Sequence, residues 1–232
     1  IGTTGTIDNK KVHKLVLEGM FGPIYKVITT KELMDQGSVA DLKIKCLVVK
    51  YDEITRKIRN KNQYADEMDF IVTHDKRNKF IRNLAINCEG NTLVLFQYVE
   101  KHGKPLYEMI KNKVHDKRKV FFIYGGTDVE AREAARLLTE KESDAIILAS
   151  FGVFSTGINI PSIENVIFAS PSKSIGRGLR LKEGKTHCNL FDIADDLHWK
   201  SWKNHTLRHL QDRVQIYAEE KFSYKIIEVD LE

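Results

Sequence analysis

Short, mostly apolar runs that alternate with amphipathic segments are the feature that most constrains how this chain can fold. A strand buried on both faces of a sheet has this composition, because neither of its sides meets water. Such runs are Lys43–Tyr51, Asn91–Tyr98, Lys119–Tyr124, Ala145–Ala149, Val166–Ala169 and Thr186–Ala194. Between them, segments such as His74–Cys88 repeat apolar residues at helical spacing. The pattern predicts an α/β fold of three layers, with a mostly parallel sheet joined by right-handed crossovers.

The segments outside this regular alternation give further expectations. Helices are predicted at Lys10–Met20, Val99–Ile110 and Thr206–Phe222, and strands at Ile24–Ile28 and Tyr224–Leu231. The region from Glu53 to Asp69 is charged with sparse apolar residues, which predicts one or two exposed helices.

Composition narrows the class of protein. The chain of 232 residues has a formal charge of +5 and a pI near 8.9, which permits an anionic partner. Cys46, Cys88 and Cys188 lie far apart without metal-ligand spacing, and are expected to be small core residues. An apolar run of membrane-spanning length and a secretory signal are both lacking, so we expect no membrane association and a cytoplasmic location.

Two motifs follow neighbouring apolar runs near the middle of the chain. Ser155–Pro161 is a turn-rich stretch that contains Thr156 and Gly157, and Gly176-Arg177-Gly178-Leu179-Arg180 carries two arginines three residues apart. In a helix this spacing puts both guanidinium groups on one face, where each can bind phosphate oxygens in bidentate fashion. Their order resembles the fifth and sixth motifs of superfamily 2 helicases. One position departs from that pattern, because Lys173 stands where the family has glutamine.

The beginning of the chain also resembles part of this family. Thr4-Gly5-Thr6 is similar to the third helicase motif, which closes the first of two RecA-like domains. The sequence has no initial methionine and starts within what looks like the end of a strand. We therefore expect a fragment, in which residues 1–40 end a first RecA-like domain and residues 41–232 form a second one. The whole resembles the phage UvsW-type branch-specific DNA helicases.

The resemblance implies a role for individual residues. Catalytic arginines would be Arg177 and Arg180, and residues coupled to ATP would be Gly157, Asn159, Thr4 and Thr6. Nucleic-acid contacts would come from Gln97, Gly126, Thr127, Thr156 and Lys173, and no metal ligand is expected. The chain has no phosphate-binding loop and no acidic box for magnesium. ATP and Mg²⁺ would therefore be held mainly by the first domain of a full-length protein, and this piece alone would be inactive.

The implied activity is ATP-dependent translocation on DNA and remodelling of forks, junctions and R-loops. Implied partners are single-stranded or branched DNA, an RNA–DNA hybrid and the first RecA-like domain in the same chain, within a bacterial or phage-infected cell.

Other functions stay open. A helicase-like module without motor activity, which binds nucleic acid or protein, is favoured by Lys173. A nuclease site would need a lysine partner for Asp66, Glu67 and Asp69 that the sequence lacks at the required spacing. The loop with Trp199 and Trp202 could contact a DNA junction or anchor the C-terminal helix.

Overall fold

One sheet of seven parallel strands organises the part of the chain that the computed structural model describes, residues 11–25, 32, 41–127, 130, 133, 137, 141–155, 162–172 and 187–231. The strands lie in the order β3-β4-β2-β5-β6-β1-β7, and every neighbouring pair is parallel. Their bounds are β1 Asp41–Lys50, β2 Thr92–Phe96, β3 Val120–Ile123, β4 Ile146–Ser150, β5 Asn165–Phe168, β6 His187–Asp196 and β7 Ser223–Asp230. The expected α/β class with a parallel sheet is confirmed.

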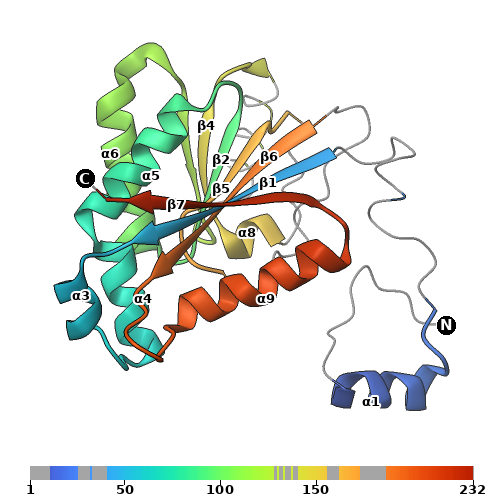
Figure 1. Ribbon diagram of the computed structural model, residues 1–232. Coiled ribbons are helices and arrows are strands. Elements are labelled where there is room, and N and C mark those ends of the chain that lie inside the picture. Colours follow the sequence, from blue (N-terminus) through green and yellow to red (C-terminus); the bar gives the residue numbers. More distant parts are fainter. Residues whose placement is uncertain are drawn as a thin grey trace.

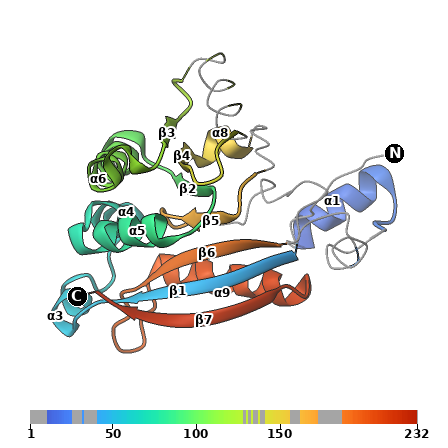
Figure 2. The same cartoon turned by 90° about the horizontal axis from the view of Figure 1, so that it is seen from above.

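Helices cover both faces of the sheet and make it the middle of three layers. Their bounds are α1 Lys11–Phe21, α3 Glu53–Ile58, α4 Tyr64–Thr73, α5 Asp75–Asn87, η1 Val99–Gly103, α6 Lys104–Val114, η2 His115–Lys117, α8 Phe151–Ser155 and α9 His205–Glu219. Figures 1 and 2 show α4, α5 and α6 on one face of the sheet and α8 and α9 against the other.

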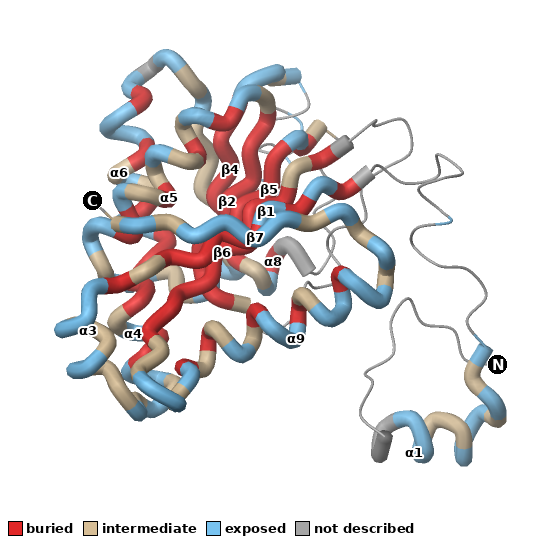
Figure 3. Tube along the Cα trace, in the orientation of Figure 1, coloured by how far each residue is buried: buried red, intermediate tan, exposed pale blue. Residues whose placement is uncertain are grey.

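Two hydrophobic clusters, one on each face, form the core. Ile81 of α5 and Ile110 of α6 pack with Val94 and Ile146 on one face, whereas Tyr217 of α9 packs on the opposite face. Figure 3 shows the buried residues concentrated in the central strands. All three cysteines are buried thiols, as the sequence predicted.

The structure corrects the expectation of exposed helices between Glu53 and Asp69. Helix α3 has no buried residue, but α4 buries Glu67, Met68, Ile71 and Val72. The sequence did not reveal this buried face, because apolar residues are sparse in the region and one of the buried side chains is a carboxylate.

The helix expected from Val99 begins differently from the prediction. Its first turn, η1, is a π-helix, in which the Gly103 N–H donates to Tyr98 O at 2.8 Å. A Cβ atom on Gly103 would lie 2.6 Å from the Phe96 ring, so only glycine fits this close approach. The wider turn places His102 in the interior with no exposed surface. Short π-helical turns of this kind are frequent at functional sites.

Arg118 ties together the amino-terminal ends of the central strands. Its guanidinium donates to the main-chain oxygens of Ile86, Gly90 and Asp144 at 2.9, 2.9 and 3.1 Å, and it pairs with the Asp144 carboxylate at 2.7 Å. This arginine therefore fixes the edge of the sheet opposite to the one at which the strands end.

Helix α1 buries little of its apolar surface. The large side chains of Leu15, Val16, Met20 and Phe21 are each at least 55% exposed. Across the described residues, no helix combines the length and the apolar character needed to cross a bilayer.

Candidate functional site

The carboxyl-terminal edge of the sheet gathers the loops in which the sequence placed its candidate residues. In an open parallel sheet, ligands bind at this edge. The loops after β3, β4, β2 and β5 follow four strands that are consecutive in the sheet. Gln97, Gly126 and Thr127 are therefore brought to one edge, beside the segment that leaves β5. The other candidates lie outside the described residues: Thr4, Thr6, Thr156, Gly157, Asn159, Lys173, Arg177 and Arg180.

The turn after β3 is tightly formed. The Thr127 hydroxyl oxygen accepts from the Tyr124 N–H at 3.0 Å, and the Thr127 N–H donates to Tyr124 O at 2.9 Å. A Cβ atom on Gly126 would lie 2.7 Å from the Tyr124 ring. Because its oxygen accepts the backbone bond, the hydroxyl proton of Thr127 remains as a donor. A phosphate oxygen is one acceptor that such a proton can serve.

A chain of hydrogen bonds runs from the Gln97 loop into the interior. The Gln97 N–H donates to Ser170 Oγ at 3.0 Å, and Ser170 Oγ lies 2.8 Å from His102 Nδ1. His102 Nε2 lies 3.1 Å from Asn78 Oδ1, and Asn78 Nδ2 donates to Val72 O at 2.9 Å.

The chemistry of these groups fixes the direction of each proton. An amide oxygen only accepts, so the proton of His102 sits on Nε2 and its Nδ1 accepts from the Ser170 hydroxyl. Burial lowers the pKa of His102 to about 3, so the ring is neutral at pH 7. The side chain of Gln97 is exposed, whereas its backbone N–H is held by the Ser170 hydroxyl.

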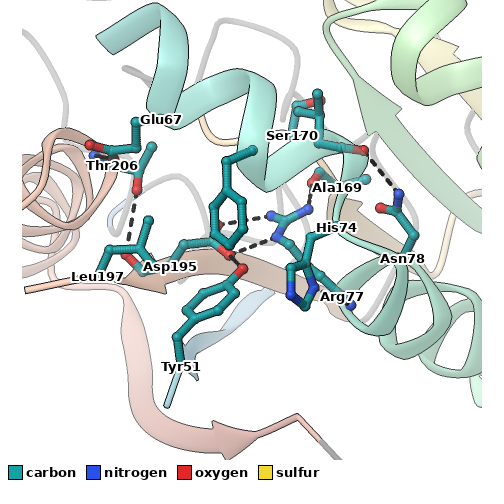
Figure 4. A network of polar contacts seen from close by, with 12 residues as sticks. Tyr51, Glu67, His74, Arg77, Asn78, Ala169, Ser170, Asp195, Leu197 and Thr206 are labelled. Carbon is teal, nitrogen blue, oxygen red and sulfur yellow. Dashed lines mark hydrogen bonds and ion pairs between the residues drawn. The ribbon is translucent and has the colours of Figure 1, made fainter. Parts of the chain in front are cut away.

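A fully buried arginine links the ends of three strands (Figure 4). Arg77 on α5 donates from Nε and Nη2 to the two carboxylate oxygens of Asp195 on β6, at 2.7 and 3.0 Å. Its Nη1 donates to the main-chain oxygen of Ala169, directly after β5, at 2.8 Å. The Tyr51 hydroxyl, directly after β1, donates to Asp195 at 2.8 Å.

A second buried arginine lies on the opposite face of the sheet. Arg213 on α9 donates from Nε and Nη2 to the two oxygens of Asp192 at 2.8 and 2.7 Å, and its Nη1 contacts the main-chain oxygen of Ser172. The Tyr217 hydroxyl also donates to Asp192, at 2.9 Å. Burial, reinforced by Asp192, raises the pKa of the nearby Cys46 thiol to about 12. This thiol is therefore not a nucleophile at neutral pH.

A buried carboxylate holds the start of α9. Glu67 accepts from the Asn204 side chain at 2.9 Å and from the backbone N–H groups of His205 and Thr206 at 2.9 and 2.8 Å. Negative charge at a helix amino terminus is favourable, because unpaired N–H groups converge there.

The tryptophan loop lies beside this start of α9. Trp199 and Trp202 exchange two backbone hydrogen bonds of 3.0 Å across a turn in which Lys200 has a φ of 53°. Glu67 holds the first turn of α9 by accepting from the His205 and Thr206 N–H groups, and the Asn204 side chain donates to Thr206 Oγ1 at 2.9 Å.

The acidic group considered for a nuclease does not converge. Asp66 is exposed, Glu67 holds α9, and Asp69 pairs with Lys101 at 2.5 Å. Within the described part of the chain, no three His, Cys, Asp or Glu side chains are placed to bind a metal ion together.

Sequence reasoning missed the buried polar residues of this edge. Asp192 and Asp195 stand in or next to a predicted buried strand, and a carboxylate in such a place requires a partner. That signal was present. The identity of the partner depends on long-range topology, because Arg77 precedes Asp195 by 118 residues.

Comparison with known proteins supplies the family. Residues 75–215 match the model of the helicase conserved C-terminal domain. The chain is 37% identical over 251 residues to the ATP-dependent DNA helicase UvsW of Enterobacteria phage T4, which covers 99% of this chain and 49% of the relative. It therefore spans about half the length of that relative.

Solved structures agree with this match. The crystal structure of T4 UvsW is similar with a TM-score of 0.73 and 34% identity, over 96% of this chain and 46% of that one. A fragment of a type I restriction enzyme HsdR subunit from Vibrio vulnificus YJ016 shares the fold, with a TM-score of 0.62 and 16% identity over 98% of this chain and 43% of that one.

Proposed function

Because this chain belongs to the family of the helicase conserved C-terminal domain, we propose that it is the C-terminal part of an ATP-dependent superfamily 2 DNA helicase that translocates on and remodels branched DNA. The observation that carries this proposal is the similarity to an ATP-dependent DNA helicase over 99% of the chain. Forks, junctions and R-loops, with an RNA–DNA hybrid, are the proposed substrates in a bacterial or phage-infected cytoplasm.

The proposed division of labour separates two domains. Residues 1–40 would end a first RecA-like domain, and residues 41–232 would form the second. The first domain would hold ATP and Mg²⁺, where the ion neutralises charge on the phosphates.

The nucleic acid would cross the carboxyl-terminal edge of the sheet. The exposed Gln97 and the turn of Gly126 and Thr127 follow strands that flank β4. Thr156, in the segment after α8, and Lys173 would add further contacts. Hydroxyl and backbone donors bind the phosphate backbone without reading sequence, which suits an enzyme that must move along any strand.

Arg177 and Arg180 would act as arginine fingers. Negative charge spreads over the γ-phosphate oxygens as the phosphoryl group is transferred to water, and a guanidinium placed there stabilises it. Gly157, Asn159, Thr4 and Thr6 would link this step to the nucleic-acid contacts. Since the fingers and the ATP cradle belong to different domains, hydrolysis would require the domains to close, and the cycle of closing and opening would move the enzyme along DNA.

The first test is DNA-stimulated ATP hydrolysis by the full-length protein that contains this chain. Replacing both Arg177 and Arg180 with alanine is expected to lower kcat by about 10³ or more. DNA affinity, measured by fluorescence anisotropy, should stay within about threefold, because the fingers face ATP. Arg208→Ala, at an exposed position on α9, is the matched control and should leave kcat unchanged.

Two results would count against the proposal. Retained hydrolysis in the double variant would remove both arginines from the finger role. A wild-type protein that binds DNA without hydrolysing ATP would instead be a motor-dead binding module, the alternative that Lys173 favours.

A further inference from the structure

Two buried arginines reach the same short segment from opposite faces of the sheet. This segment, Ala169–Ser172, is the exit segment: it directly follows β5 and leads into the residues that include Arg177 and Arg180. We propose that Arg77 and Arg213 are positioning residues that fix the exit segment and thereby aim the arginine fingers. The proposal rests on the proposed function.

The opposite approach of the two arginines follows from strand geometry. Asp192 and Asp195 stand three residues apart on β6, and successive side chains of a strand point to opposite faces. One carboxylate therefore faces α9 and receives Arg213, whereas the other faces α5 and receives Arg77. Both arginines have no exposed surface.

The register of the sheet brings these ion pairs to the end of β5. Phe168, the last residue of β5, lies beside Asp192, while β6 continues to Asp196. The exit segment therefore starts beside the part of β6 that β5 does not reach. Each guanidinium uses two nitrogens on its carboxylate and a third on a main-chain oxygen of the exit segment, Ala169 for Arg77 and Ser172 for Arg213.

Other bonds hold the residues between these two points. The N–H groups of Ala169 and Ser170 both donate to Leu95 O, at 2.9 and 3.3 Å, and the Ser170 hydroxyl joins the Gln97 loop. The same segment is thus bound to a loop proposed to contact DNA and to both buried arginines. Any displacement of the exit segment would break several buried hydrogen bonds together.

Stability alone is a weak reason for these ion pairs. Burying two charges costs as much hydration as their attraction returns, and apolar replacements of such pairs are often neutral or stabilising. A guanidinium, however, is a rigid fork that sets direction as well as distance. Arginines that must stabilise a transferring phosphoryl group need such precision, because a misplacement of about 1 Å can reduce rate about 100-fold.

The test uses Arg213→Lys in the full-length protein, which keeps the charge and removes the fork. Arg77→Lys tests the hold on the exit segment from the other face of the sheet, and it replaces the first variant if that variant folds poorly. Arg118→Lys is the matched control, because Arg118 also binds main-chain oxygens through a side chain that is only 9% exposed, at the opposite edge of the sheet. All proteins are assayed well below their melting temperatures.

Two measurements distinguish a role in positioning the arginine fingers from a role in the stability of the fold. Hydrogen exchange measured by mass spectrometry should show amide exchange in the exit segment at least tenfold faster in Arg213→Lys and unchanged in Arg118→Lys. Nucleic-acid-stimulated ATP hydrolysis should lose at least tenfold in kcat, with the KM for ATP within about threefold and DNA affinity within about twofold of wild type.

The inference is overturned if exchange of the exit segment does not change, or if Arg118→Lys lowers kcat as much as Arg213→Lys. A wild-type protein with no ATP hydrolysis would instead refute the proposed function. In that case hydrogen exchange alone decides whether the two arginines hold the exit segment.

Discussion

Single residues at the carboxyl-terminal edge show how polar groups are accommodated in an apolar interior. His102, Asn78 and Ser170 are buried, yet each donor in their chain faces one acceptor. Buried polar groups are tolerated under that condition, because an unmade hydrogen bond costs about 1–3 kcal/mol. The arrangement favours a neutral His102, since a second ring proton would point at the Ser170 hydroxyl oxygen, and the hydroxyl proton would then lose its own acceptor.

We predict that His102 makes the protein sensitive to acid. In the folded protein the pKa of His102 is about 3, below its ordinary value of 6.5. The imidazole therefore binds a proton more readily in the unfolded chain than in the folded one. Its contribution to stability is complete above pH 6.5 and falls by about 1.4 kcal/mol per pH unit below it, or about 2 kcal/mol at pH 5. In urea unfolding, His102→Gln should lose less stability than wild type between pH 7.5 and pH 5.

The control for this prediction is His115→Asn, at an exposed position outside the buried hydrogen-bond network. Its loss of stability between the two pH values should equal that of wild type. Some acid sensitivity will remain in His102→Gln, because burial also lowers the pKa of His74. An unchanged pH dependence in His102→Gln would show that the buried ring is protonated in the folded state.

At the scale of elements, local patterns located strands and helices well, because apolar periodicity reports which face is buried. The helix predicted at His74–Cys88 is α5, and the strand predicted at Tyr224–Leu231 is β7. The same reasoning could not find the buried face of α4. Glu67 is buried there because α9, which starts at His205, supplies backbone donors to it.

The candidate site was less predictable than the fold. The sequence proposed Gln97 and the turn of Gly126 and Thr127 at strand ends, and parallel pairing does bring them to one edge. Arg213 gave no signal, since an arginine on an amphipathic helix is ordinarily exposed. Only the packing of α9 on β6 puts it beside Asp192.

We predict that Glu67→Ala lowers the free energy of unfolding by about 2–4 kcal/mol, because it leaves the backbone N–H groups of His205 and Thr206 at the start of α9 without their acceptor. Asp66→Ala is the control, an exposed carboxylate in the same first turn of α4, and should cost less than about 1 kcal/mol. Urea unfolding of both variants measures the difference. Equal losses would mean that helix-end charge, and not the bonds to α9, explains Glu67.

At the scale of the whole molecule, the sheet ends in β7, a long strand with little cover. Ile226 and Ile227 are 56% and 39% exposed, and as neighbours they point to opposite faces. An edge strand of this kind presents unpaired backbone groups that can bind another strand. Its charged residues Lys225 and Glu228 oppose such pairing.

We therefore predict that Ile226→Lys slows aggregation just below the melting temperature and changes the free energy of unfolding by less than about 0.5 kcal/mol. Turbidity at several protein concentrations is the measurement. Ile54→Lys is the control, because Ile54 is 72% exposed on helix α3 and its replacement adds the same charge at a position that is not on a strand. Equal slowing in both variants would assign the effect to net charge.

The place of β1 in the sheet has a consequence for the time at which the fold can form. Its register partner on β6 lies 146 residues later in the chain, and its other neighbour, β7, comes later still. A ribosome adds about 5–20 residues per second, so β1 waits roughly 7–30 s for its first partner. During synthesis this apolar strand is thus among the earliest parts of the sheet to be made and among the last to be paired. Its protection in that interval falls to chaperones or to transient contacts with the growing chain.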